Sequence, residues 1–247
     1  MAVFPTTLKK TPLVEASFEI RFNSSFPSEA VFGVAFQSLS SKMTNPAVVN
    51  LPLASLPQEM WSGDSSLKFQ AQRQIKKGNW IVGIGPQVVA FSLHGKYPGW
   101  SEYSRQVSNF SSGLFSTGIF KDVISIGLRY VNIINSPLSE VSKMSLVVGQ
   151  RSVPCDSPVS LRFEEHHLRQ NIITQLNSNV LVSIGGADPV KSSIIDVDVQ
   201  EVLNISGIDL EKRLQSLMEG LHDREKESFF SFIDASFLKK LEPDYGE

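Results

Sequence analysis

The chain is short of cysteine and of long apolar runs. Cys155 is the one cysteine in 247 residues, so no disulfide can form within the chain, which is typical of a reducing compartment. The first residues hold no apolar run of signal-peptide length, and no stretch approaches the roughly 20 apolar residues of a membrane-spanning helix. We therefore expect a soluble, cytoplasmic protein without a membrane partner.

Excess charge of either sign is also missing. The chain has 23 Lys and Arg against 25 Asp and Glu, which gives a formal net charge of -2. Proteins that bind nucleic acid usually show a basic excess, and the predicted helices carry neither a basic stripe nor a helix-turn-helix pattern. We therefore do not expect nucleic acid as a partner.

Several enzyme signatures are missing too. The sequence has no GxxxxGK[ST] phosphate loop, no GxGxxG, no HExxH and no GxSxG. The glycines of "VGIGPQ" are not followed by a helix N-terminus, so we attribute them to turn geometry and not to phosphate binding. The sequence therefore predicts no catalytic residue and no cofactor.

What is present is a strong hydrophobic period. Apolar residues make up 41% of the chain and charged residues 19%, which is typical of a globular protein. Residues 13–22 and 121–137 alternate between apolar and polar side chains, as half-buried strands do. Residues 44–64 hold three prolines and no period, so we expect an irregular connection there. Further strands are predicted at 66–75, 80–85, 88–95, 157–176, 179–186 and 191–203, and helices at 28–42, 97–115, 207–230 and 235–241.

These elements predict an α+β fold with one or two antiparallel sheets. The first half reads strand, helix, strands, helix, strand, and the strand-rich second half ends in a long C-terminal helix. We place the boundary between an N-terminal half, 1–136, and a C-terminal half, 137–247, with one continuous domain as the alternative. The predicted N-caps of three helices are Ser28, Asp209 and Asp234.

The most organised predicted strand, in residues 121–137, carries Arg129, Tyr130 and Asn132 close together in its middle. Alternation puts Tyr130 and Asn132 on the apolar face and Arg129 on the other, so the three cannot form one simple cluster. Arg129 could pair with Glu15 and Glu19 across neighbouring strands, whereas Asn132 would need a buried partner. We interpret both as structural, with a binding groove at Arg129 as the alternative.

Asp196 and Asp198 are the candidate metal ligands. Two residues apart on a strand, their carboxylates share a face and could hold a divalent cation or act as acid and base. The alternative is the solvent-facing side of an amphipathic strand. His166 and His167 are neighbours on a strand and point to opposite faces, so they cannot hold one metal together, and Cys155 reads as a loop thiol with no activating base.

The C-terminal segment carries more apolar surface than one helical face can bury. Leu210, Leu214, Leu217, Met218 and Leu221 form a stripe that predicts packing on the sheet. The surplus that follows predicts a homodimer or partner contact, with an intramolecular fold-back as the alternative. The side chains of this predicted contact are Phe229, Phe230, Phe237 and Leu238.

Four segments together resemble a family of sporadically distributed bacterial proteins of about this length. They are "PLVEASFEIRF", "YPGWSEYSRQV", "IGLRYVN" and "LHDREKESFFSFI". Members of that family are known mainly as hypothetical proteins. The resemblance implies one shared architecture and the patchy distribution of mobile or defence-associated genes, and it implies no catalytic residues.

We therefore expect a non-enzymatic protein that binds a protein partner or forms a homo-oligomer. The resemblance implies an antitoxin, immunity or accessory protein of a bacterial defence or toxin–antitoxin locus. One alternative is a metal-dependent enzyme that acts on a nucleotide or nucleic acid through Asp196 and Asp198. Another is a chaperone-like client binder.

Overall fold

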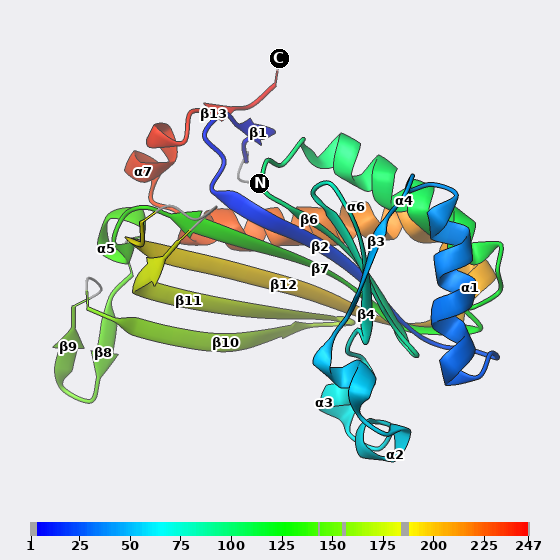
Figure 1. Cartoon of the computed structure of the whole chain (residues 1–247). Helices are drawn as coiled ribbons and strands as arrows, with labels where there is room; N and C mark the ends of the chain where they lie inside the picture. Colours follow the sequence, from blue (N-terminus) through cyan, green and yellow to red (C-terminus); the bar gives the residue numbers. More distant parts are fainter. Residues whose placement is uncertain (1–3, 143, 155–156, 184–187, 247) are drawn as a thin grey trace. The chain divides into compact units, whose positions relative to one another are not determined.

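The computed structural model describes residues 4–142, 144–154, 157–183 and 188–246, and it shows the predicted α+β fold with an antiparallel sheet (Figure 1). Its long C-terminal helix is also as predicted. The strands are β1 (Thr7–Leu8), β2 (Leu13–Asn23), β3 (Ala47–Asn50), β4 (Arg73–Lys77), β5 (Trp80–Gly85), β6 (Val88–His94), β7 (Asp122–Ile134), β8 (Leu146–Val148), β9 (Arg151–Val153), β10 (Val159–His167), β11 (Gln170–Val182), β12 (Val190–Ser206) and β13 (Pro243–Asp244). The helices are α1 (Ser28–Ser40), η1 (Pro52–Ser55), α2 (Gln58–Trp61), α3 (Ser65–Lys68), α4 (Trp100–Phe115), α5 (Leu138–Val141), α6 (Gly207–Phe232) and α7 (Ala235–Lys240).

The main sheet has nine strands in the order β10-β11-β12-β7-β2-β6-β5-β4-β3. The order mirrors itself about the neighbouring strands β2 and β7. Each begins a series whose last strand, β6 or β12, returns to pair with it, and a long helix follows, α4 or α6. The chain therefore repeats one topology, a series of strands followed by a long helix, without a repeat of residues.

Two compact units divide the described chain in space. One combines residues 1–15, 129–199 and 222–247, and the other combines residues 16–128 and 200–221. The predicted boundary at 136/137 divides the chain along its length, whereas each of these units draws on both halves because β2, β7, β12 and α6 run through both. They are the first and the second unit of the chain.

The core of the second unit lies between its strands and α4. Phe18, Ile20 and Phe22 of β2 are fully buried, as their alternation predicts. The ring of Tyr103 on α4 stacks on Trp80, and its hydroxyl donates a hydrogen bond of 3.0 Å to the carbonyl oxygen of Phe91. The strands predicted within 13–22 and 121–137 are confirmed as β2 and β7, each with a buried apolar face.

Helix starts agree with the predictions in one case of three. The Asp234 side chain accepts a hydrogen bond of 2.8 Å from the backbone N–H of Ser236 and caps α7, as predicted. The prediction for α1 is wrong, because the helix includes Ser28 and its N-cap is Pro27. At α6 the cap is Ser206, whose hydroxyl oxygen accepts from the backbone N–H of Asp209 at 3.1 Å, so Asp209 lies inside the first turn.

The segment between α1 and β5 differs most from the prediction. Residues 44–64, expected to be irregular, contain the short strand β3, the 3-10 helix η1 and the helix α2. The strand expected from residue 66 begins at Arg73, because residues 65–68 form the turn of helix α3. Within the described residues, no helix has both the length and the apolar character needed to cross a bilayer.

Gly83 and Gly85 of β5 are explained by close approach and not by turn geometry. A Cβ at Gly83 would lie 3.0 Å from the Cβ of Ala71, and one at Gly85 would overlap the carbonyl oxygen of Gln70. The segment before β4 thus lies directly against the β5 backbone. Only glycine leaves room for this contact.

Replacement of Gly85 by alanine should therefore destabilise the protein. We expect Gly85→Ala to lower the free energy of unfolding by about 1–3 kcal/mol, because the methyl group must displace the backbone at Gln70. Gly33→Ala is the matched control: its Cβ would meet nothing within 4 Å and it lies within α1, so alanine should stabilise by up to about 1 kcal/mol. Urea melts of both variants check the prediction, and equal effects would contradict it.

Candidate functional site

The two end strands of the main sheet differ in their protection. An end strand has unpaired backbone N–H and C=O groups on its outer side, and proteins usually shield such a row with charged side chains. β10 follows this rule with Arg162, Glu164, Glu165, His166 and His167. β3, with the sequence AVVN, carries no ionisable side chain.

β3 exposes apolar side chains as well as its backbone edge. Val48 is 45% exposed and Val49 is 38% exposed. Val48 lies opposite Ile75 of β4, and Asn50 lies opposite Arg73. Because side chains alternate along a strand, Val48 and Asn50 share one face of the sheet. β3 is therefore an uncharged, apolar template on which another strand can pair.

A hollow of about 210 Å³ lies where the chain leaves β3. It is smaller than the roughly 300–1,000 Å³ of pockets for drug-sized ligands, so its size suits one side chain better than a cofactor. Leu56 at its rim is 38% exposed. The hollow is lined by Ser28, Glu29, Phe32, Ala54, Leu56, Gln58, Trp61, Gln72, Arg73, Ile84, Gly85 and Pro86.

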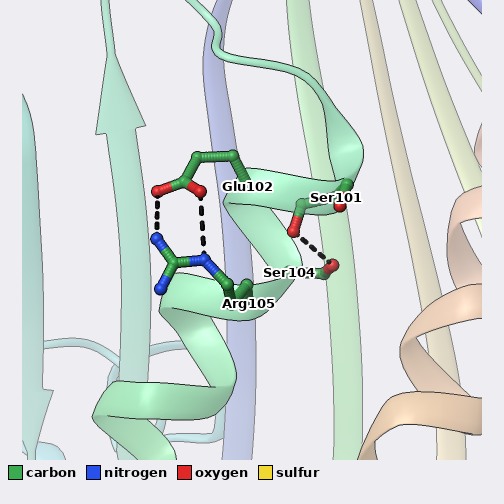
Figure 2. A network of polar contacts seen from close by, with 4 residues as sticks. All are labelled: Ser101, Glu102, Ser104 and Arg105. Carbon is green, nitrogen blue, oxygen red and sulfur yellow. Dashed lines mark hydrogen bonds and ion pairs between the residues drawn. The ribbon is translucent and has the colours of Figure 1, made fainter.

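Arg73 joins the hollow to the end strand. Its guanidinium lies 4.8 Å from the centre of the Phe32 ring, and its Nε donates a hydrogen bond of 3.2 Å to the Asn50 side-chain oxygen. Neither contact brings a negative charge. By comparison, Arg105 of α4 donates two hydrogen bonds to the carboxylate of Glu102, at 2.6 and 3.0 Å (Figure 2). Within the described residues, Arg73 therefore keeps guanidinium donors for an acidic ligand.

Arg129 pairs with Asp196, which the sequence did not predict; of the two expected partners, Glu15 acts on Arg129 through its charge. Its Nε and Nη2 donate to the two carboxylate oxygens at 2.8 and 2.6 Å. These hydrogen bonds raise the pKa of Arg129 against the effect of burial, and the charges of Asp196, Glu15 and Asp198 add to the increase. The partner is on β12, the other neighbour of β7.

This ion pair removes the basis for a metal at Asp196 and Asp198. Both oxygens of Asp196 already accept from Arg129, so a cation would have to displace a guanidinium. In the part of the chain that the structure describes, no three His, Cys, Asp or Glu side chains form a group that could hold a metal. Cys155 lies outside the described residues.

Asn132 is buried on its strand, whereas the two histidines of β10 are exposed. Asn132 is 4% exposed and its Nδ2 donates to the carbonyl oxygen of Ile195 at 3.3 Å, which is the buried partner that the sequence requires. His166 and His167 are exposed at the end of β10.

The C-terminal aromatic residues pack within the chain. Phe229 and Phe237 are each 5% exposed, although both were predicted to contact a partner. Phe230 stacks on Phe4 at a centroid distance of 5.6 Å, and Phe232 meets Phe163 edge to face. Leu238, also predicted, is half-buried. Because packing inside the first unit accounts for the apolar surplus, the observation behind the predicted contact is removed.

Glu225 is a buried acid that the sequence does not reveal. It is 2% exposed, and burial raises the pKa of its carboxyl well above the usual range. Within the described residues its Oε1 has no hydrogen-bond partner. Its helical neighbour His222 approaches the Tyr130 hydroxyl at 3.3 Å through Nδ1, and burial, with the nearby charge of Lys226, lowers the His222 pKa to about 3.

These two groups predict opposite pH dependences of stability. The folded state keeps a proton on Glu225 that the unfolded state loses above the ordinary pKa of 4.5, so stability falls as the pH rises beyond that value. The unfolded state gains a proton on His222 below its ordinary pKa of 6.5, so stability falls as the pH drops from 6.5 towards 3. Between pH 4.5 and 6.5 the two effects oppose each other.

Single variants should separate the two effects. Urea melts across the pH range should show that Glu225→Gln reduces the loss of stability above pH 6.5, because the amide does not titrate. His222→Asn should reduce the loss below pH 4.5. Glu211→Gln, at an exposed position of the same helix, is the control and should leave both losses of stability as they are in the wild type. A loss of stability above pH 6.5 that is as large in Glu225→Gln as in the wild type would contradict the assignment.

The chain matches no protein-family model, and no curated protein matches its sequence. The geometry of the described residues is therefore the basis for a functional assignment.

Proposed function

We propose that this chain is a non-enzymatic, cytoplasmic protein-binding component that captures an extended segment of a partner protein along β3. The observation that carries the proposal is the end strand itself, which is uncharged, exposed and apolar at Val48 and Val49. The opposite end strand, β10, carries the charged side chains that discourage such pairing.

Strand addition uses the groups that β3 presents. An added strand would lie roughly 5 Å from β3 and satisfy the backbone donors and acceptors of its outer side. These hydrogen bonds supply affinity for any extended chain, whereas pockets for alternate side chains supply specificity. The hollow that follows β3 supplies such a pocket, and its size favours one segment over the unselective binding of a chaperone-like protein.

The biological setting follows from the resemblance to sporadically distributed bacterial proteins. In an antitoxin, immunity or accessory protein of a defence locus, the partner is the product of a neighbouring gene. A protein that holds its partner through one exposed strand needs no catalytic group of its own. This role is therefore consistent with the absence of cofactor motifs from the sequence.

Co-expression with the neighbouring gene products tests the proposal. We expect one product to remain bound to the wild-type chain through gel filtration and to be lost from a Val48→Asp, Val49→Asp double variant, because two carboxylates on the end strand oppose pairing. The matched control is Val147→Asp, Val148→Asp on β8, where both valines are 62% exposed. This control should retain the partner.

Both double variants change exposed side chains, so their free energies of unfolding should stay within about 1 kcal/mol of the wild type, roughly the sum of two surface effects. A partner that remains bound to the β3 variant would contradict the proposal. The absence of a complex with every neighbouring product would do the same.

A further inference from the structure

The hollow beside β3 lies close to the path of an added strand. Leu51, the residue after β3, donates a backbone hydrogen bond of 2.8 Å to the carbonyl oxygen of Gln72, which lines the hollow. The chain then continues through Ala54 and Leu56, which line it too. A segment that pairs with β3 and extends beyond Asn50 would therefore run towards the hollow.

The register of β3 on β4 decides which side chains of an added strand meet Arg73. Asn50 lies opposite Arg73 and accepts a hydrogen bond from it, so the guanidinium lies on the face shared by Val48 and Asn50. The ring of Phe32, which also lines the hollow, lies under the same guanidinium. On an added strand, residues two apart share this face. The side chain of one such residue can reach the Arg73 guanidinium, and the side chain two positions further along can reach the hollow.

Charge favours an acidic segment. β3 and β4 together carry Arg73, Lys76 and Lys77 and no acidic residue. An added strand would lie about 10 Å from β4, two strand spacings away and close to the Debye length at physiological salt. The long Arg73 side chain brings its charge closer to the added strand than the β4 backbone is. The two N–H groups of its planar guanidinium match the two oxygens of a carboxylate. Glu29, in the first turn of α1, is the acidic residue in the lining of the hollow, so the apolar side chain and not the carboxylate belongs there.

We infer, on the basis of the proposed function, that the partner segment is acidic and alternates a carboxylate with a large apolar side chain two residues away. The carboxylate pairs with the Arg73 guanidinium. The apolar side chain enters the hollow between Phe32, Leu56 and Trp61. The recognised chemistry is thus an Asp or Glu and a Phe, Trp, Leu or Met on one face of an extended chain.

Selection from a displayed library of random peptides tests this inference on the whole chain. We expect the enriched peptides to share an acidic residue two positions from a large apolar one. Synthetic copies should bind Arg73→Gln about tenfold more weakly than the wild type, since a charge-assisted hydrogen bond is lost. Leu56→Asp, at the exposed rim, should weaken binding similarly because it places a charge where the apolar side chain enters.

Arg105→Gln is the matched control. Arg105 is an exposed arginine of the same unit, and it already pairs with Glu102. This variant should bind like the wild type. A selection without preference for acidic residues, or affinity that is equal in Arg73→Gln and the wild type, would overturn the inference.

The Val48→Asp, Val49→Asp variant distinguishes this failure from a failure of the proposed function. Peptides that lack the acidic pattern but lose affinity for this variant would leave strand addition at β3 standing and refute the partner chemistry alone. Peptides that bind this variant as tightly as the wild type, or a selection that enriches nothing, would refute both.

Discussion

Alternation of side chains on the central strands is the constraint on which the rest of the structure depends. Ala16, Phe18, Ile20 and Phe22 of β2 are each at most 1% exposed, which commits one face of this strand to the core. A shift of register by one residue would place these side chains in water and bring Glu19 and Arg21 inside. The covered face of β2 therefore has no freedom for binding, and function must use the ends of the sheet, its other face or the loops.

Those parts of the fold that rest on local period could be predicted from the sequence, and those that rest on distant neighbours could not. The alternation of β2 and β7 and the leucine stripe of α6 are visible in the residues themselves. The partner of Arg129 was missed because only the strand order shows that β12 lies beside β7. Glu225 was missed because the charged sequence around it is typical of a solvent-facing helix, although its own position is turned inward.

The candidate site was missed for a related reason. β3 has four residues and follows Pro46 in a segment without hydrophobic period, so propensity alone gives no signal. Its meaning comes from its place at the end of the sheet, where exposed valines and an unpaired backbone edge coincide with a hollow and an arginine without an acidic contact in the described residues. Each feature alone is common on protein surfaces, and their combination gives a direction and a register for an incoming strand.

Backbone hydrogen exchange tests most directly whether an extended chain adds to β3. The free chain should exchange the outward N–H groups of Ala47–Asn50 rapidly, and a bound peptide should slow them at least about tenfold, which corresponds to about 1.4 kcal/mol of added protection. The N–H groups of the other end strand, β10, should be unaffected. Unchanged exchange at β3 in a saturated complex, or protection that arises at β10 instead, would contradict the account.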